Sequence, residues 1–188
     1  MARAGQILAG LTVGAARAVV VDVGSGGGWA ARYLRDADVI AIDLLDVGSP
    51  WALGVRGDMS HLPLQDGVAD GILFAASLHY GSLDEVLLEA ARVLRVDGLL
   101  VVVDSPIYSD SAGQVQAAAR SAAYYLKSGY PDLADRYHPI SAMAFRTALL
   151  ESGFEIERFE FGSGRSRLWR FRRRPPGTLV VAHRVKRT

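Results

Sequence analysis

The chain has 188 residues, of which 50% are hydrophobic, and this is enough for one domain over residues 1–188 with a sizeable core. It contains no cysteine, which excludes disulfides, thiolate metal sites and a cysteine nucleophile. The net charge is +1, and no apolar stretch approaches the about 20 residues that a transmembrane helix needs.

The charge is unevenly distributed along the chain. Residues 158–188 hold ten Arg or Lys side chains against one acid, Glu160, whereas residues 1–157 hold 11 basic and 19 acidic side chains. A basic end of this kind is typical of a protein that binds an anionic partner. A solvated basic hairpin on an acidic body explains the same asymmetry, and the sequence leaves both interpretations open.

The first 18 residues imitate a weak signal peptide. Arg3 precedes a short apolar stretch, and the stretch closes with Ala-Arg-Ala at residues 16–18. Glycines interrupt the apolar stretch, however, and a strand follows at once. We therefore expect a cytoplasmic protein.

Continuous apolar runs alternate with amphipathic segments through the first half of the chain. The predicted strands lie at residues 18–24, 38–44, 55–58, 71–77 and 99–104. Helices are expected at residues 29–37 and 84–98, the second with acids in its first turn and Gly98 as its stop. Strands that alternate with helices predict an α/β fold with a parallel sheet covered on both faces.

The pattern changes after Asp104. Helices are expected at residues 111–129 and 141–153, the second with Ser141 as its cap and Gly153 as its stop. Residues 130–139 have the composition of a loop. The last two predicted strands, residues 154–161 and 178–185, are expected to pair antiparallel.

The sequence "VVVDVGSGGG" (residues 19–28) places glycines at the carboxyl end of the first predicted strand, where open α/β sheets bind ligands. The dinucleotide pattern G-x-G-x-x-G fails because its last position falls on Trp29. The phosphate-binding P-loop fails because no Gly-Lys-Ser/Thr follows. The pattern that fits is D-x-G-x-G-x-G, formed by Asp22, Gly24, Gly26 and Gly28.

Asp22 helps to decide which ligand this loop binds. A carboxylate repels a pyrophosphate and attracts an ammonium group, and S-adenosylmethionine carries an ammonium and a sulfonium but no phosphate. Asp43 ends the next predicted strand, where an acid can accept hydrogen bonds from both ribose hydroxyls of either S-adenosylmethionine or NAD. The glycine spacing and Asp22 favour S-adenosylmethionine and leave a dehydrogenase as the less favoured interpretation.

Four segments of the chain resemble the class I S-adenosylmethionine-dependent methyltransferases, in particular the group that includes the ubiquinone-biosynthesis methyltransferases. They are "VVVDVGSGGG", "VIAIDL", "GDMSHLPLQDGVADGILFAASLHY" and "EVLLEAARVLRVDGLLVVVDS", within residues 19–105. The resemblance implies a Rossmann-like fold with a seven-stranded mixed sheet of order 3-2-1-4-5-7-6, flanked by helices. Its seventh strand would be antiparallel, in agreement with the strand pair expected at the end of the chain.

The resemblance also implies which residues contact the cofactor. Gly24, Ser25 and Gly26 would lie against its methionine part. Asp43 would bind the ribose, and Leu44 would lie against the adenine. The complete implied set is Asp22, Gly24, Ser25, Gly26, Gly28, Asp43, Leu44, Asp58, Met59 and Ala75.

The later members of this set come from the third and fourth strands. Asp58 would meet the adenine amino group, Met59 would lie beside the ring, and Ala75 would border the sulfonium. Each position also has a purely structural interpretation: glycines suit any tight strand–helix turn, and Asp58 suits any turn.

Two features depart from the family's pattern. The family has a full helix between the positions of Asp43 and Asp58, but the 14 residues available here leave room for at most one turn. We therefore expect Trp51 or Leu53 to complete the adenine pocket. Because few residues precede the first strand, either the site is unusually open or another part of the chain covers it, and the tyrosine-rich 106–140 segment is the candidate cover.

Methyl transfer is an in-line displacement, and it needs a general base only where the acceptor is protonated. His79 and Tyr80 follow the fourth predicted strand, so His79 is the candidate base and Tyr80 can orient the acceptor. A hydrogen bond from His79 to a neighbouring loop is the alternative. His138 is either a second candidate or an exposed loop residue. The histidines lack metal-ligand spacing, so we expect no metal.

The stretch "RSRLWRFRRRPPG" (residues 165–177) interleaves arginines with Trp169 and Phe171. This composition can bind phosphates and stack on RNA bases, but it also arises in a strand with one solvated face. Small anions, such as carboxylates, would suit it as well. We expect a small-molecule acceptor; the alternative is an RNA methyltransferase, or an inactive nucleic-acid-binding relative, that uses residues 165–174.

Overall fold

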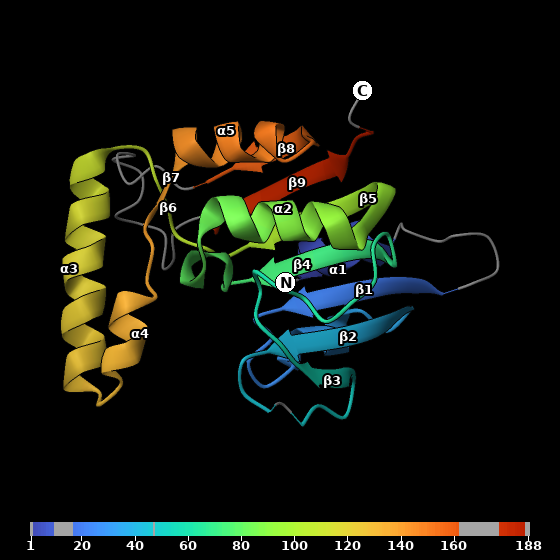
Figure 1. Ribbon diagram of the computed structural model, residues 1–188, viewed down its shortest axis with the longest axis horizontal. Helices are drawn as coiled ribbons and strands as arrows, with labels where there is room; N and C mark the ends of the chain where they lie inside the picture. The colour runs from blue at the N-terminus through green and yellow to red at the C-terminus, as the bar shows by residue number, and fades with distance from the viewer. Residues whose placement is uncertain (1, 10–16, 47, 162–176, 187–188) are drawn as a thin grey trace.

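The computed structural model describes residues 2–9, 17–46, 48–161 and 177–186. Its centre is a seven-stranded sheet of order β3-β2-β1-β4-β5-β9-β8 (Figure 1). Neighbouring strands from β3 to β5 are parallel, and β9 runs antiparallel to both β5 and β8. This confirms the predicted order and the antiparallel last pair. The strands are β1 (Ala18–Val23), β2 (Ala37–Asp43), β3 (Leu53–Arg56), β4 (Ala69–Ala75), β5 (Leu94–Val103), β8 (Phe154–Glu160) and β9 (Leu179–Arg184).

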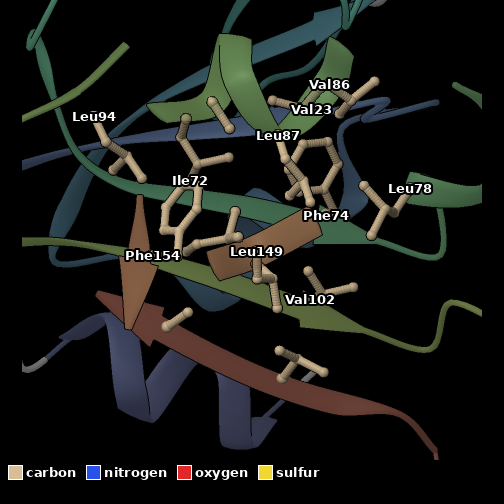
Figure 2. Packing of buried hydrophobic residues seen from close by; sticks show 14 of the residues in the cluster. Val23, Ile72, Phe74, Leu78, Val86, Leu87, Leu94, Val102, Leu149 and Phe154 are labelled. Atoms are coloured by element: carbon tan, nitrogen blue, oxygen red, sulfur yellow. The ribbon is translucent and has the colours of Figure 1, made fainter. Parts of the chain in front are cut away.

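Helices cover both faces of the sheet. On one face lie α2 (Leu83–Val93) and α5 (Ala142–Glu151), whose Leu87 and Leu149 pack with Phe74 of β4 (Figure 2). On the other face lie α1 (Ala2–Ala9) and the 3-10 helix η1 (Trp29–Tyr33), packed on β4 and β5. Burial on both faces explains why the central strands are continuous apolar runs rather than alternating ones.

The helix predicted at residues 29–37 is shorter in the structure, so the prediction of its length is wrong. Only η1 forms, and a turn closed by hydrogen bonds from the Leu34 N–H to the Ala31 carbonyl and from the Ala37 N–H to the Leu34 carbonyl leads into β2. The physical reason is strand register: Ala37 already pairs with Ala18, so a nine-residue helix would consume the start of β2.

The helix predicted at residues 84–98 ends early, and its proposed stop lies inside a strand. Helix α2 ends at Val93, and Leu94 already pairs with Ala69 of β4. Gly98 is buried, and a Cβ there would lie 2.9 Å from the Arg95 carbonyl oxygen. This glycine therefore permits a close approach within β5 and does not terminate a helix.

The 106–140 segment stands beyond the ends toward which the parallel strands point (Figure 1). It contains the short strand β6 (Ile107–Tyr108), the long helix α3 (Ser111–Lys127) and α4 (Pro131–Asp135), and β6 pairs with β7 (Ile140–Ser141). The expectation that residues 130–139 are only loop is wrong, because Pro131 occupies the first turn of α4, where it costs no hydrogen bond.

Helix α5 follows its prediction closely. The Ser141 side chain accepts a hydrogen bond from the Ala144 N–H at 3.4 Å, as a helix cap does. Gly153, at φ 85°, ends the helix in the left-handed region that glycine tolerates. Within the described ranges, no helix is both long enough and apolar enough to cross a membrane.

Gly5 lets α1 approach η1 closely. A Cβ at Gly5 would lie 2.7 Å from the Tyr33 carbonyl oxygen, a backbone atom that cannot move aside alone. We expect Gly5→Val to lower the free energy of unfolding by about 2–3 kcal/mol, measured by urea denaturation. The control is Gln6→Val on the exposed side of the same helix, and equal losses in both variants would contradict this packing.

Candidate functional site

The residues predicted to bind a ligand gather at the carboxyl ends of the parallel strands. β1 leads into the glycine loop, residues 24–28, while β2 ends at Asp43 and β4 at Ala75 (Figure 1). The N–H groups of Gly24 and Ser25 both donate to the Ile42 carbonyl, at 2.8 and 3.1 Å. These bonds attach the glycine loop to the end of β2.

The glycines of the loop have different physical roles. Gly24, at φ 67°, has no room for a side chain, since a Cβ would lie 2.5 Å from the Ser77 Cβ. Gly28, at φ 64°, likewise has no room for a side chain, because a Cβ there would lie 2.5 Å from the Ser49 Cβ. A Cβ on Gly26 would meet nothing within 4 Å, so this glycine marks the open side of the loop, where a ligand can approach.

Asp43 connects β2 to the glycine loop. Its carboxylate accepts a hydrogen bond from the Gly26 N–H at 2.8 Å through Oδ2 and one from the Leu45 N–H at 3.1 Å through Oδ1. The side chain is only partly buried, and the neighbouring Leu44 is 40% exposed. An acid and an apolar side chain thus stand together on the open side of the loop.

Asp22 and Ser25 lie beneath the loop and are both buried. Asp22 is fully buried, and neither its carboxylate oxygens nor the Ser25 hydroxyl has a hydrogen-bond partner among the described residues. Burial, reinforced by the charge of Asp43, raises the pKa of Asp22 to about 7. A buried carboxylate without a partner fits a cationic ligand group and would repel a phosphate.

Asp58 and Met59 reach the site from the segment after β3. The Asp58 carboxylate accepts hydrogen bonds from the Ser60 N–H at 2.9 Å and the Ser60 hydroxyl at 2.7 Å, and these bonds hold its pKa below the usual value. The methyl carbon of Met59 lies 3.4 Å from the position that a Cβ on Gly24 would take. Asp58 thus closes a turn with Ser60, and Met59 packs directly against the glycine loop.

The link between β2 and β3 contains no helix among its described residues, as the sequence predicts. Ser49 of this link packs against Gly28, and its hydroxyl donates to the Gly28 carbonyl at 3.4 Å. Trp51 and Leu53 are 52% and 67% exposed, and their contact with the adenine stays a prediction.

Ala75 and His79 mark the end of β4. Ala75 is the last residue of the strand, and Ala76 turns the chain with a φ of 58°. His79 lies in the 3-10 helix η2 (Leu78–Tyr80), is 7% exposed, and has no hydrogen-bond partner for Nδ1 among the described residues. Burial lowers the pKa of His79 to about 4, so the imidazole is neutral at pH 7.

Tyrosines of the 106–140 segment close over η2 and form, with Tyr80, a tyrosine cluster. The His79 ring lies 4.2 Å from the Tyr80 ring and 5.2 Å from the Tyr137 ring, measured between centroids. The hydroxyls of Tyr80 and Tyr125 share a short hydrogen bond, and those of Tyr108 and Tyr137 are 3.3 Å apart. The cluster consists of Tyr80, Tyr108, Tyr125 and Tyr137.

In the part of the chain that the structure describes, none of the other three histidines places its side chain in hydrogen-bond or ring contact with His79 or the tyrosine cluster. The His138 N–H donates to the His79 carbonyl at 2.8 Å, but its side chain is exposed. His183 contacts Glu157 at 3.0 Å, and His61 is exposed. Over the described ranges, no group of three or more His, Asp or Glu side chains could hold a metal ion.

Sequence reasoning missed the serines that support the loop. Ser77 stands behind Gly24 and donates to the Val23 carbonyl at 2.5 Å, and Ser49 stands behind Gly28. Nothing in the local sequence marks either serine, because each contacts its glycine across a long chain separation. The arginine-rich stretch at residues 165–174 lies outside the described residues.

Known proteins are similar to this chain over part of its length. Residues 21–102 match the family model described as a methyltransferase domain. A 25S rRNA adenine methyltransferase of Schizosaccharomyces pombe is 31% identical over 100 residues, covering 53% of this chain and 31% of its own. The malonyl-(acyl-carrier protein) O-methyltransferase of Geobacter sulfurreducens is 29% identical over 158 residues, covering 75% and 57%. The chain thus spans less than two thirds of either relative.

Solved structures share the fold. A methyltransferase structure from Bacillus halodurans superposes with a TM-score of 0.70 at 18% identity, covering 97% of this chain and 99% of that one. The geranyl diphosphate C-methyltransferase of Streptomyces coelicolor, solved with S-adenosyl-L-homocysteine, gives 0.70 at 16% identity, covering 97% and 79%. In fold and in the matched residues 21–102, the chain is similar to the class I S-adenosylmethionine-dependent methyltransferases. S-adenosylmethionine is the cofactor of this class, and the unpartnered Asp22 fits its ammonium group.

Proposed function

We propose that the protein transfers the methyl group of S-adenosylmethionine to a small-molecule acceptor at the carboxyl end of β4. The observation that carries the proposal is a pair of buried polar side chains without partners on adjacent parts of the sheet. Asp22 of β1 is a buried carboxyl whose charged form a cation would stabilise, and His79 just beyond β4 is a neutral imidazole that can take a proton. A cationic cofactor and a proton-bearing acceptor satisfy both.

The cofactor-binding roles follow the order of the strands. The backbone of Gly24, Ser25 and Gly26 holds the methionine part above Asp22. In the same pocket, Gly28 keeps the loop closed against Ser49, and Asp43 accepts the ribose hydroxyls. The adenine lies against Leu44 and Met59, with Asp58 toward its amino group and Ala75 toward the sulfonium.

When bound, the cofactor supplies a methyl group on an activated sulfonium. Burial lowers the pKa of His79 and keeps its imidazole neutral, so it is free to take the proton that a hydroxyl or amine acceptor loses as the methyl group is transferred. Tyr80 keeps its proton, because burial and its hydrogen bond with Tyr125 raise its pKa, and it can therefore donate a hydrogen bond that orients the acceptor. The tyrosine cluster excludes water from this position.

The cofactor assignment is tested by Asp43→Ala in a calorimetric titration with S-adenosylhomocysteine. The variant loses the acceptor for the ribose hydroxyls and for the Gly26 N–H, so we expect binding weakened by about 10- to 100-fold. Asp46→Ala, an exposed acid of the same link, is the matched control. Unchanged affinity in Asp43→Ala would contradict the ribose role, and binding of NADH by the wild type would favour a dehydrogenase.

An RNA acceptor is the second candidate. The observations that favour it are the rRNA methyltransferase among the relatives and the ten basic side chains in residues 158–188. RNA affinity that falls steeply with added salt would favour this candidate, because phosphate contacts release counterions. Placement in the ubiquinone-biosynthesis group, and a single domain over residues 1–188, stay predictions from the sequence.

A further inference from the structure

The long helix α3 carries an apolar stripe on its exposed side. The helix stands at one end of the molecule, with α4 beside it (Figure 1). At about 100° per residue, five exposed apolar residues fall within an arc of about 80°. We call them the outer stripe: Ala112, Val115, Ala119, Ala123 and Leu126. Val115 and Leu126 are 68% and 62% exposed, so the chain itself does not cover this stripe.

The side of α3 that contacts the rest of the protein carries polar groups instead. Gln114 donates a hydrogen bond to the Pro139 carbonyl at 2.9 Å, and the Tyr125 hydroxyl is hydrogen-bonded to that of Tyr80. Ala117 is the only buried residue of the helix. A helix that packs only on its own protein turns its apolar side chains inward. The reverse arrangement in α3 points to a partner that covers the outer stripe.

The order of large and small residues makes the outer stripe complementary to itself. Val115 and Ala123 lie four residues to either side of Ala119, and Ala112 and Leu126 lie seven residues to either side. If two copies of α3 pack antiparallel about Ala119, Leu126 of each faces Ala112 of the other. In the same way, Val115 faces Ala123. Each large side chain then meets a small one, as interdigitating helices require.

The charges of α3 are compatible with this antiparallel arrangement. Arg120 and Lys127 lie roughly 100° and 80° around the helix from Ala119, at the edge of the stripe, so the stripe itself is uncharged. Antiparallel packing brings Lys127, in the last turn, beside the start of α3 in the second copy, where Asp110 caps the helix. The opposed helix dipoles add a further favourable contribution.

We propose that the outer stripe is the contact between two copies of this chain, whose α3 helices pack antiparallel about a two-fold axis at Ala119. The stripe is about 21 Å long, because 14 residues separate its ends. This is short for the about 800 Å² per partner that a stable interface buries. The dimer therefore forms reversibly, at micromolar concentrations or above. The inference does not depend on the proposed function.

The first test is sedimentation velocity of the full chain between about 1 and 500 µM, without ligand. We expect self-association that increases with concentration. Ala119→Glu places two like charges at the two-fold axis and should weaken association at least about tenfold. Tyr124→Glu is the control, because Tyr124 is 65% exposed and lies about 140° around α3 from Ala119, so this variant should still associate. Circular dichroism checks that both variants are folded.

Cross-linking then tests the direction of the helices. The chain contains no cysteine, so single introduced cysteines report on this contact alone. Under mild oxidation, Ala119→Cys should form a disulfide-linked dimer and Tyr124→Cys should not. Ala112→Cys should cross-link to Leu126→Cys in a mixture but not to itself, because antiparallel packing holds the two copies of residue 112 about 21 Å apart.

Three results would overturn the inference: a monomer at every concentration, association that Ala119→Glu leaves unchanged, or cross-linking of Ala112→Cys to itself. The first would mean that a different protein covers the outer stripe. The second would place the contact elsewhere on the molecule, and the third would mean that the helices pack parallel.

Discussion

Replacing Gly24 by alanine is expected to weaken S-adenosylhomocysteine binding by at least about 100-fold while leaving the protein folded. The added Cβ would lie 2.5 Å from the Ser77 Cβ, and the φ of 67° is strained for any residue with a side chain. Ser77 cannot retreat, because it is buried and its hydroxyl is bonded to the Val23 carbonyl at 2.5 Å. The loop must move instead, and the ligand-binding backbone moves with it.

Gly48→Ala, in the link between β2 and β3, is the control for Gly24→Ala. Gly48 is exposed, a Cβ there would meet nothing within 4 Å, and Gly48 does not have a positive φ, so this variant should bind like the wild type. Circular dichroism and the thermal midpoint establish that both variants are folded. Equal binding in Gly24→Ala and Gly48→Ala would show that the close contact with Ser77 does not position the loop.

The second large effect is a dependence of cofactor binding on pH. Burial and the neighbouring Asp43 raise the pKa of Asp22 to about 7, so below that pH the free protein carries a neutral Asp22. An ammonium group binds the carboxylate, and its binding must therefore release a proton. Affinity for S-adenosylhomocysteine is expected to rise by up to about tenfold per pH unit from pH 5.5 and to level off near pH 7.

Calorimetry in buffers of different ionisation enthalpy counts the released proton directly. The wild type should release close to one proton at pH 6, and Asp22→Asn should release none and bind with a flat pH profile. Asp46→Asn, whose carboxylate is exposed, should retain the wild-type profile. A flat profile in the wild type, or an unchanged slope in Asp22→Asn, would remove Asp22 from the ammonium site.

The same group links stability to pH with the opposite sign. The pKa of Asp22 is above its unfolded value of 3.8, so the folded state binds more protons than the unfolded state between pH 3.8 and about 7. The contribution of Asp22 to stability therefore falls as the pH rises through that window. Asp22→Asn removes this slope, which urea denaturation at several pH values would detect.

The central sheet could be predicted because its pattern is strong. β1 and β4 are buried on both faces and therefore appear as mostly apolar runs, and Asp22 and Asp43 fall near the ends of β1 and β2. The short helix η1 could not be predicted, because the register that pairs Ala18 with Ala37 is a property of the sheet and not of residues 29–37.

The side-chain contacts that shape the site could not be predicted from short stretches of sequence either. Ser77 bonds to a carbonyl 54 residues earlier, and Ser49 reaches Gly28 across 21 residues. The glycine motif indicated that some group lies close to the loop backbone. Only the fold shows that at Gly24 and Gly28 this group is a serine side chain of the protein itself. Of the three alternating glycines, Gly26 alone is left open toward a ligand.

The 106–140 segment is connected to the sheet side of the molecule by very short strands. β6 and β7 have two residues each, and the family match at residues 21–102 ends before either of them. The segment contributes no strand to the seven-stranded sheet, so an exchange within it leaves the pairing of β1 to β5 in place. During evolution, the choice of acceptor can change in such a segment while the cofactor site is inherited intact, and relatives that share residues 21–102 need not share an acceptor.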